Sequence, residues 1–571
     1  MSRYLIQVTI GPVQDFIASA RKLRDLWFGS NLLSELSKTV ARSLKEQGGE
    51  LIFPFAASDD DLKIDSALIV ANKILVEFDK EISPAQVVAK TKSAWISHRN
   101  IFAEKTLKKI FEIKNLNINQ ELYKKQILDS GEFFAAWVTL TDDYKSSKAK
   151  LEKLLAGRKN LREFNAPAWD GTGIPKNSLD GIREAVTGDK QQEIVGLIKK
   201  NEKLDTLGCI KRFYPITSGH QKKKFDDLSS IAILPWLKGL ERMDQNLVLK
   251  FLSNFIGQGS LQNNLSTINP EDHALYFYLE KSELKEFGTL EDYKKLKSII
   301  RKEPHKYACI LVGDGDNMGK TLDMIETARG HRTFTRHLGD FANKIGKTIE
   351  QYQGSLIYAG GDDVMAYLPL HTIIACAEAI RKKFSAAMQT IYSELNLPGT
   401  CPTFSIGVAV VHHSSPLDQA LNKARKAESI AKEEGGRNAL AIIQSKRGGS
   451  DLCVYDKWEY PDKEGIISRF QSICTLYEDK KLPATLGYQL RQASIDAGDN
   501  LKFKLSLDAK NLVPLNAASA LLIRIFDQKE HSQSLKTLLL DQTSIRKLSD
   551  ELVIALQLAK AENMSKGGEK W

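Results

Sequence analysis

The sequence lacks any run of about 18 uninterrupted apolar residues, which a membrane-spanning helix requires. Its first residues, MSRYLIQVTI, enter an alternating strand pattern directly. They show none of the basic, apolar and small-residue regions of a secretory signal. We therefore expect a cytoplasmic protein with no membrane partner.

Cysteine is scarce, with six residues spread along the chain and no Cys-x-x-Cys pair. Without a secretory signal, such cysteines are typically reduced and structural, so we expect no disulfide framework. The six are Cys209, Cys309, Cys376, Cys401, Cys453 and Cys474.

Charge of one sign does not dominate, because 81 Lys and Arg face 71 Asp and Glu in a formal net charge of +10. This moderate basic excess leans towards a polyanionic partner over a plain solvated surface. The 571 residues exceed what one hydrophobic core supports, so the chain should fold as several domains. We predict four regions, 1–165, 166–300, 301–445 and 446–571.

The first region has an α/β pattern. Residues 3–10 alternate as in a half-buried strand, and a helix pattern begins at Asp15 and ends at Gly29-Ser30, before a second, Leu-rich helix. Three further stretches are typical of strands: LIFPF, ALIVANKILVEF and FFAAWVTL. Residues 156–183 lack periodicity and predict a long loop, and a mostly helical segment follows to about residue 300.

A second α/β unit opens with YACILVGDGDNMG. Its pattern predicts a strand at 307–313, helices to about 351, a hairpin around GGDD, a helix at 371–394, a strand at CPTFSIGVAVV, a helix at 416–434 and a strand at ALAII. This β-α-β-β-α-β order is the ferredoxin-like arrangement. We expect its first strand to pair with the strand that precedes the hairpin. From about 446 the sequence is typical of helices to the end.

Three carboxylates should meet at one edge of this unit. Asp314 ends the first strand, Asp362 and Asp363 lie at the hairpin tip, and neither turn contains a Lys or Arg to pair with them. Oxygen ligands of this kind suit Mg²⁺ or Mn²⁺. Two such ions can activate an attacking hydroxyl and neutralise a leaving pyrophosphate, which is the chemistry of nucleotidyl transfer.

Residues around the carboxylates could hold a nucleotide. The backbone amides of Gly315, Asp316 and Asn317 enter a helix and could bind a triphosphate, and Lys432 could reach the same phosphates. Taken singly, each motif has a simpler explanation: a helix cap, a tight turn, a solvated lysine. Their order within one β-α-β-β-α-β frame favours the catalytic interpretation.

The third region resembles the palm domain shared by GGDEF-type nucleotide cyclases and the large subunit of type III CRISPR effector complexes, the Cas-ten family. The stretch IGPVQDFIASARKLRDLWFGSNLLSEL is similar to the first palm of the Cmr (III-B) form of that subunit. IYAGGDDVMAYLP, LVGDGDNMGK, TFSIGVAVVHH and AKEEGGRNALAI extend the resemblance over most of the chain.

The resemblance implies two ferredoxin-like palm domains, a helical domain between them and a helical C-terminal domain. It implies a subunit that, within a complex of Cmr-type subunits with crRNA and target RNA, polymerises ATP into cyclic oligoadenylate. Asp314 and Asp363 would be the main metal ligands, supported by Asp362, and Lys432 would bind phosphate. The nucleotide would approach Gly360 and Gly361 closely, and a second ATP in the non-catalytic first palm would be lined by Gly11, Gly29 and Ser30.

The sequence departs from the family pattern in two respects. Many members carry an N-terminal HD nuclease domain, whereas this sequence starts at the palm and contains no His-Asp dipeptide, so we expect no DNase activity. Many have a cysteine zinc site between the palms, whereas only Cys209 precedes residue 309 here, so we expect no zinc.

Three alternatives stay open. Some Cmr-type members are thought to join ATP to S-adenosylmethionine instead of making cyclic oligoadenylate. A free-standing GGDEF-like cyclase and a non-catalytic scaffold subunit are the other two.

Overall fold

The computed structural model describes residues 3–79, 82–113, 116–161, 173–188, 201–217, 227–241, 303–446, 448–496 and 544–568, with the shorter pieces 198, 244–249, 251, 277–278, 290–299, 505–508, 511–514 and 524. In this part of the chain no helix is long and apolar enough to cross a membrane. All six cysteines are free thiols.

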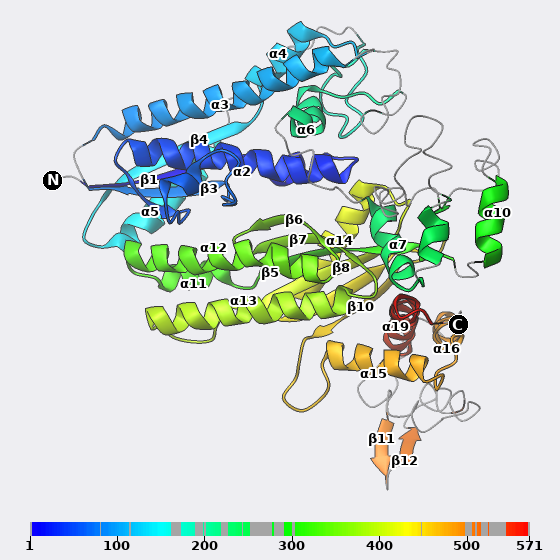
Figure 1. The fold of residues 1–571 in the computed structure, drawn as a ribbon. Helices are drawn as coiled ribbons and strands as arrows, with labels where there is room; N and C mark the ends of the chain where they lie inside the picture. Colours follow the sequence, from blue (N-terminus) through cyan, green and yellow to red (C-terminus); the bar gives the residue numbers. More distant parts are fainter. Residues whose placement is uncertain are drawn as a thin grey trace.

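The first unit is built on a four-stranded sheet in the order β2-β3-β1-β4, whose described pairs are all antiparallel. The first strand lies between the third and the fourth, as in a ferredoxin-like unit. Helices α2 and α3 pack on one face and α5 on the other (Figure 1). The elements are β1 (Arg3–Gly11), α1 (Gln14–Ala18), α2 (Leu23–Glu46), β2 (Glu50–Phe53), the short 3₁₀ helix Asp59–Leu62, β3 (Lys73–Phe78), α3 (Pro84–Glu112), α4 (Gln120–Leu128), β4 (Glu132–Leu140) and α5 (Tyr144–Asn160).

Four expectations for this unit were wrong. The helix expected from Asp15 is interrupted between Ala18 and Leu23, and the strand expected at 67–78 begins only at Lys73. Strand β1 is buried on both faces, because helices cover both sides of the sheet and enclose Leu5 as well as Ile6. The predicted helix break at Gly29-Ser30 is the interior of the continuous helix α2. Gly29 is tolerated inside the helix, and a Cβ there would make only ordinary contacts, at 3.5 Å from the Cα of Ile17 and 3.4 Å from the Lys211 side chain.

The second unit has a six-stranded sheet in the order β10-β9-β8-β5-β7-β6. The predicted strands, helices and hairpin are confirmed to within a few residues. The elements are β5 (Tyr307–Gly315), α11 (Met318–Met324), α12 (Ala328–Gln351), β6 (Ser355–Gly360), β7 (Asp363–Pro369), α13 (Ile373–Leu395), β8 (Phe404–His412), α14 (Leu417–Glu433), β9 (Ala439–Gln444) and β10 (Leu452–Lys457).

The expected strand pairing was wrong in this sheet. Strand β5 pairs with β7, the second strand of the hairpin, and β6 lies outside β7 at the edge. Strand β7 is buried over most of its length, whereas β6 is only partly buried. A more apolar strand is favoured in the interior of a sheet, where both of its faces are covered.

The remaining described elements are mainly helical. They are α6 (Thr206–Thr217), α7 (Leu228–Lys238), α10 (Leu290–Ile299), α15 (Ile466–Glu478), α16 (Leu486–Asp496), β11 (Leu505–Asp508), β12 (Asn511–Pro514) and α19 (Ile545–Ser565). The expectation that everything after 446 is helical was wrong, because β10 extends the second sheet and β11 pairs with β12. Of the predicted loop at 156–183, residues 156–160 belong to α5 and 162–172 lie outside the described residues.

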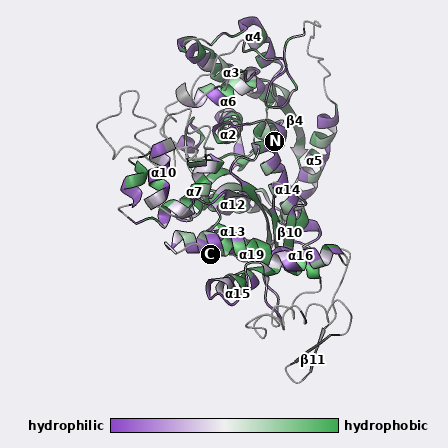
Figure 2. Cartoon of the chain, turned by 90° about the vertical axis from the view of Figure 1, so that its right-hand side faces the viewer, coloured by the Kyte–Doolittle hydropathy of each residue, from purple (hydrophilic) through white to green (hydrophobic). Residues whose placement is uncertain are grey.

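The two units share an apolar junction. Helices α1 and α2 bring Ile17, Leu23 and Leu26 against Ile310 and Met365 on the second sheet. Polar contacts add to it, since Arg332 of α12 pairs with Glu50 and Glu77 of the first sheet at 3.1 and 3.2 Å. Figure 2 shows hydrophobic residues along the strands between the helical layers.

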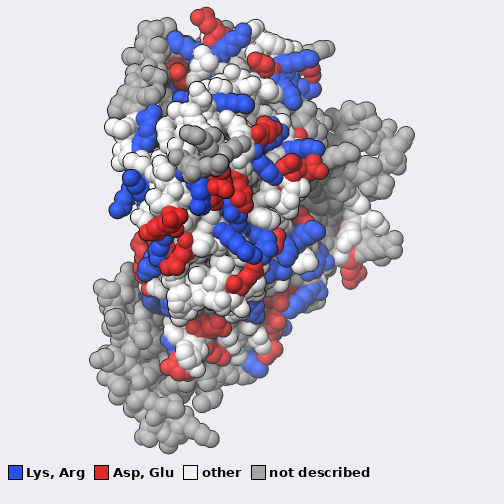
Figure 3. All heavy atoms as spheres, turned by 90° about the vertical axis from the view of Figure 1, so that its left-hand side faces the viewer, with Lys and Arg blue, Asp and Glu red and all other residues white. Residues whose placement is uncertain are grey.

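The surface shown in Figure 3 carries both signs of charge. Lys and Arg are interspersed with Asp and Glu over the described part of that face. Nucleic-acid-binding surfaces usually carry a concentrated patch of positive charge. The described part of this face carries no such patch (Figure 3).

Candidate functional site

The predicted carboxylates meet where β5 and β7 end. The antiparallel register pairs Gly313 with Val364, so Asp314 lies opposite Asp363. The side chains of Asp314 and Asp363 share a hydrogen bond, and Asp362 lies in the hairpin turn beside them. The convergence inferred from sequence is thus found, although through a different strand pair.

The glycines of this edge allow a close approach of backbone and side chains. A Cβ on Gly360 would lie 1.6 Å from the Tyr358 hydroxyl, and a Cβ on Gly315 would lie 3.0 Å from that of Asp362. Gly361 has φ +75°, a conformation that glycine adopts without strain. The Gly-Gly pair is therefore required by the hairpin itself.

The electrostatics show an excess of negative charge. Burial, reinforced by Asp314, raises the pKa of Asp362 to about 6. Burial also raises the pKa of Asp363, and the neighbouring Asp314 and Asp362 add to the shift. Carboxyl groups behave in this way when they share a site without enough positive charge nearby.

Lys432, in the last turn of α14, is the cation of the site. Its ammonium group pairs with Asp314 and, at 2.6 Å, with Glu428 one helical turn earlier. Partial burial disfavours its charged form, but the two carboxylates outweigh this and raise its pKa. Glu428 was not identified from the sequence.

Asp316 points into the protein. Its carboxylate accepts hydrogen bonds from the Thr403 hydroxyl at 2.7 Å, the Ser405 hydroxyl at 2.8 Å and the Asn438 backbone amide at 3.0 Å. The Asp316 amide donates to the Thr403 carbonyl, also at 2.8 Å. The side chain therefore fastens the turn after β5 to β8 and to the loop before β9. No feature of the local sequence indicated these partners.

Asn317 and the backbone of Gly315 lie beside this anchor. Asn317 is exposed at the start of α11 and has a left-handed backbone conformation, with φ 59°. Asparagine adopts this conformation more readily than most residues. The turn therefore places an exposed polar side chain, that of Asn317, at the edge of the carboxylate site.

The three residues predicted for the first unit are not equivalent in the structure. Gly11 ends β1 and lines a cavity. Gly29 and Ser30 are buried inside α2 and do not line that cavity. The second nucleotide site stays a prediction.

Within the described residues, no group of three or more His, Cys, Asp or Glu side chains is arranged as a metal site. At the predicted site, Asp314 is paired with Lys432.

Comparisons with known proteins match both units. Residues 307–441 match the family described as Cas10/Cmr2, second palm domain, and residues 5–115 match CRISPR-associated protein Cmr2, N-terminal. The CRISPR system Cmr subunit Cmr2 of Pyrococcus furiosus is 24% identical over 557 residues, which cover 80% of this chain and 63% of that protein. The chain thus spans less than two thirds of the length of this relative.

Solved structures agree in fold. A type III-B Cmr-beta structure in the apo state matches with TM-score 0.59 and 14% identity, covering 87% of this chain and 76% of the other. Cmr-beta bound to cognate target RNA matches with TM-score 0.57 and 14% identity, covering 87% and 77%. The fold is that of a paired-palm protein. The second unit thus matches the second palm domain of Cas10/Cmr2 proteins, and the first unit matches the N-terminal part of Cmr2.

Proposed function

We propose that this chain is the large, nucleotide-polymerising subunit of a crRNA-guided type III-B effector complex. Its partners would be the other Cmr-type subunits and, through them, crRNA and target RNA. When target RNA binds, the subunit makes a nucleotide second messenger from ATP, either cyclic oligoadenylate or an ATP–S-adenosylmethionine conjugate. The observation that carries the proposal is the opposition of Asp314 and Asp363 at the edge of the second sheet.

The donor set fits Mg²⁺ or Mn²⁺. All three acidic side chains offer oxygen, and the raised pKa values of Asp362 and Asp363 indicate that positive charge is lacking. A bound divalent cation would supply charge neutralisation and activation of the attacking hydroxyl there. Asp314 and Asp363 would hold it, with Asp362 beside them.

The chain's own residues would bind and orient ATP. Lys432, released from Asp314, would contact the phosphates as a point charge. Gly361, with φ +75°, would let the turn lie against the nucleotide, whereas the Tyr358 hydroxyl fills the space beside Gly360, and Met318 and Asp362 fill that beside Gly315. Asp316 would act indirectly, by holding the turn whose amides face the phosphates.

The test uses the assembled complex with cognate target RNA, Mg²⁺ or Mn²⁺, labelled ATP and, in parallel, S-adenosylmethionine. Mass spectrometry identifies the products. We expect an RNA-dependent product that disappears in the double variant Asp362→Ala, Asp363→Ala and persists in the control Asp323→Ala, an exposed carboxylate on α11.

Two results would decide against parts of the proposal. A product unchanged in the double variant would show that the site assignment is wrong. Absence of product under every combination would favour a scaffold subunit, and formation of product by the isolated chain without RNA would favour a free-standing cyclase.

A further inference from the structure

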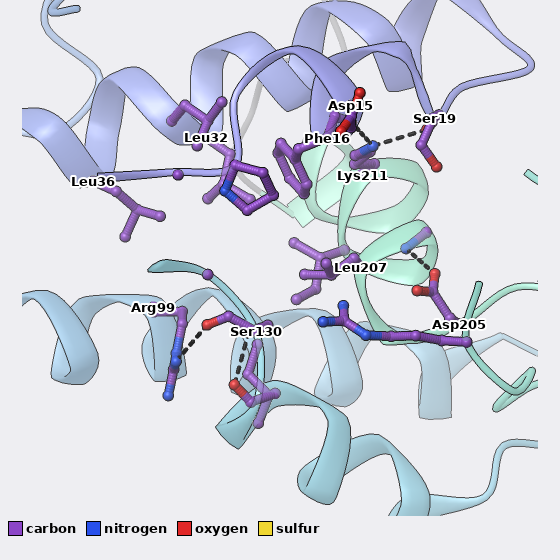
Figure 4. A pocket seen from close by; sticks show the side chains of 18 of the residues that line it. Asp15, Phe16, Ser19, Leu32, Leu36, Arg99, Ser130, Asp205, Leu207 and Lys211 are labelled. Atoms are coloured by element: carbon purple, nitrogen blue, oxygen red, sulfur yellow. Dashed lines mark hydrogen bonds between the residues drawn. The ribbon is translucent and has the colours of Figure 1, made fainter. Parts of the chain in front are cut away.

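A separate cavity of about 410 Å³ lies in the first unit, within the size range of small-molecule sites. Helices α1, α2, α3 and α6 and the turn before β4 form its walls (Figure 4). Most of the lining is apolar, including Phe16, Leu32, Leu36, Phe102 and Leu207. The cavity could therefore enclose an apolar body.

Two guanidinium groups line the cavity without an ion-pair partner among the described carboxylates. Arg99 is only 8% exposed and donates to the Ser130 carbonyl at 2.6 Å. Arg183, half-buried, donates to the Asp129 carbonyl at 3.3 Å. Both side chains are thus held at the turn before β4 by neutral groups. Burial lowers the pKa of Arg99, and the nearby Asp129 offsets this only in part. A buried cation without a direct salt bridge is unfavourable, so this wall would gain from an anionic ligand group.

A carboxyl group at the start of α6 would instead gain from a cationic ligand group. Asp205 is 3% exposed, and one of its oxygens accepts from the Gly208 amide at 2.7 Å. No salt bridge joins it to a described cation, and burial raises its pKa, although the more distant charges of Arg183 and Lys211 offset part of this shift. Figure 4 shows Arg99 and Asp205 on opposite sides of the cavity, with Leu207 between them.

Two other charged lining groups are already engaged. Lys211 donates to the backbone carbonyls of Phe16 and Ser19, the latter at 2.8 Å. Asp180 accepts from the Ser19 hydroxyl at 2.8 Å and from the Ile182 amide at 3.0 Å. Asp15 also lines the cavity but is exposed to solvent. The buried or half-buried charges that remain for a ligand are therefore the two guanidinium groups and the Asp205 carboxyl.

We propose that this cavity binds a small zwitterion of the α-amino acid type with a large apolar side chain. Arg99 and Arg183 bind its carboxylate, Asp205 binds its ammonium group, and the apolar side chain lies among Leu32, Leu36 and Phe102. Neither the cyclase chemistry nor the Asp314 site enters this argument. Charge-assisted hydrogen bonds in a site of low polarity provide both affinity and orientation.

The position of the cavity gives a bound ligand a route to the second sheet. Phe16 of α1 lines the cavity, whereas its neighbour Ile17 packs against Ile357 and Met365 of the GGDD hairpin strands. A ligand that orders α1 would therefore stabilise the junction between the units.

The experiment measures binding to the purified full-length chain by isothermal titration calorimetry. The probes are L-phenylalanine, 3-phenylpropionate, which lacks the ammonium group, and phenethylamine, which lacks the carboxylate. We expect L-phenylalanine to bind, with at least about tenfold weaker binding of each truncated probe.

Variants assign the two charges. Arg183→Gln should weaken the binding of L-phenylalanine about tenfold and leave the binding of phenethylamine unchanged. Asp205→Asn should leave the binding of 3-phenylpropionate unchanged. Lys108→Gln, an exposed lysine on α3, is the control and should bind like the native chain. Because Arg183 is only half-buried, its variant should fold, and it tests the carboxylate-binding role even if the Asp205 variant fails to fold.

Three outcomes would overturn the proposal. Equal binding of all three probes would show a purely apolar site. No binding of L-phenylalanine up to about 10 mM would show no site of this class. Displacement of L-phenylalanine by ATP would assign the cavity to the nucleotide.

Discussion

Replacement of Asp316 by alanine should release the turn after β5. The carboxylate accepts from Thr403, Ser405 and the Asn438 amide inside the protein, and only 1% of the residue is exposed. Three hydrogen bonds to a charged group, at the lower limit of about 1.5 kcal/mol each, would sum to about 4.5 kcal/mol. Relief of a buried charge offsets part of this, so we expect a net loss of about 3 kcal/mol.

The assay is native-state hydrogen exchange of the full chain, because a multidomain protein does not unfold as one two-state unit. A loss of about 3 kcal/mol corresponds to exchange about a hundredfold faster at the amides near Asp316 and Ser405. Asp323→Ala, which removes an exposed carboxylate on α11, is the matched control. The double variant Thr403→Val, Ser405→Ala should speed hydrogen exchange at the same amides.

The reasoning fails if the Asp316 variant exchanges like the Asp323 control. Loss of nucleotide product with unchanged exchange would instead show that the Asp316 side chain acts directly on the nucleotide or metal.

Three further predictions concern the framework of the two units. Burial lowers the pKa of His331 to about 4, below the usual 6.5. As the pH falls, the unfolded chain therefore binds a proton before the folded chain does, and the free energy of unfolding drops by up to about 3 kcal/mol between these pH values. His331→Gln should flatten the pH dependence of thermal unfolding in this range. Gly407→Ala would place a Cβ 2.0 Å from the Glu428 amide and push α14, which carries Lys432, off the sheet, so product formation should fall. Gly319→Ala is the control, because no atom lies within 4 Å of the added Cβ, and product formation should be unchanged. Arg212→Met removes the partner of buried Asp25 and should cost about 3–5 kcal/mol, seen as a lower Tm; an unchanged Tm would refute the ion pair's role.

Local patterns were sufficient for most elements of the second unit. Short apolar runs marked β5 and the hairpin strands, and the Gly-Gly-Asp-Asp junction marked the turn, because these features depend on residues close in sequence. Asp314, Asp362 and Asp363 were also correctly expected to converge, since each lies at the end of a strand in the same sheet.

The pairing partner of β5 was assigned wrongly, because both hairpin strands are apolar enough to lie beside it. The ferredoxin-like order itself places the first strand between the third and the fourth, as found for β5 between β7 and β8. Likewise, Gly29-Ser30 had the composition of a helix end, but both residues are buried inside the continuous helix α2.

The sequence by itself determined the ferredoxin-like order, the carboxylates at a strand edge and the family, because those depend on local residue types and their succession. Only the tertiary structure decided that Asp316 faces inward, that Lys432 pairs with Asp314 and Glu428, and that charged groups of both signs line a cavity in the first unit. These facts depend on side chains from segments far apart in the chain, whose distances are fixed only when the sheets and helices pack.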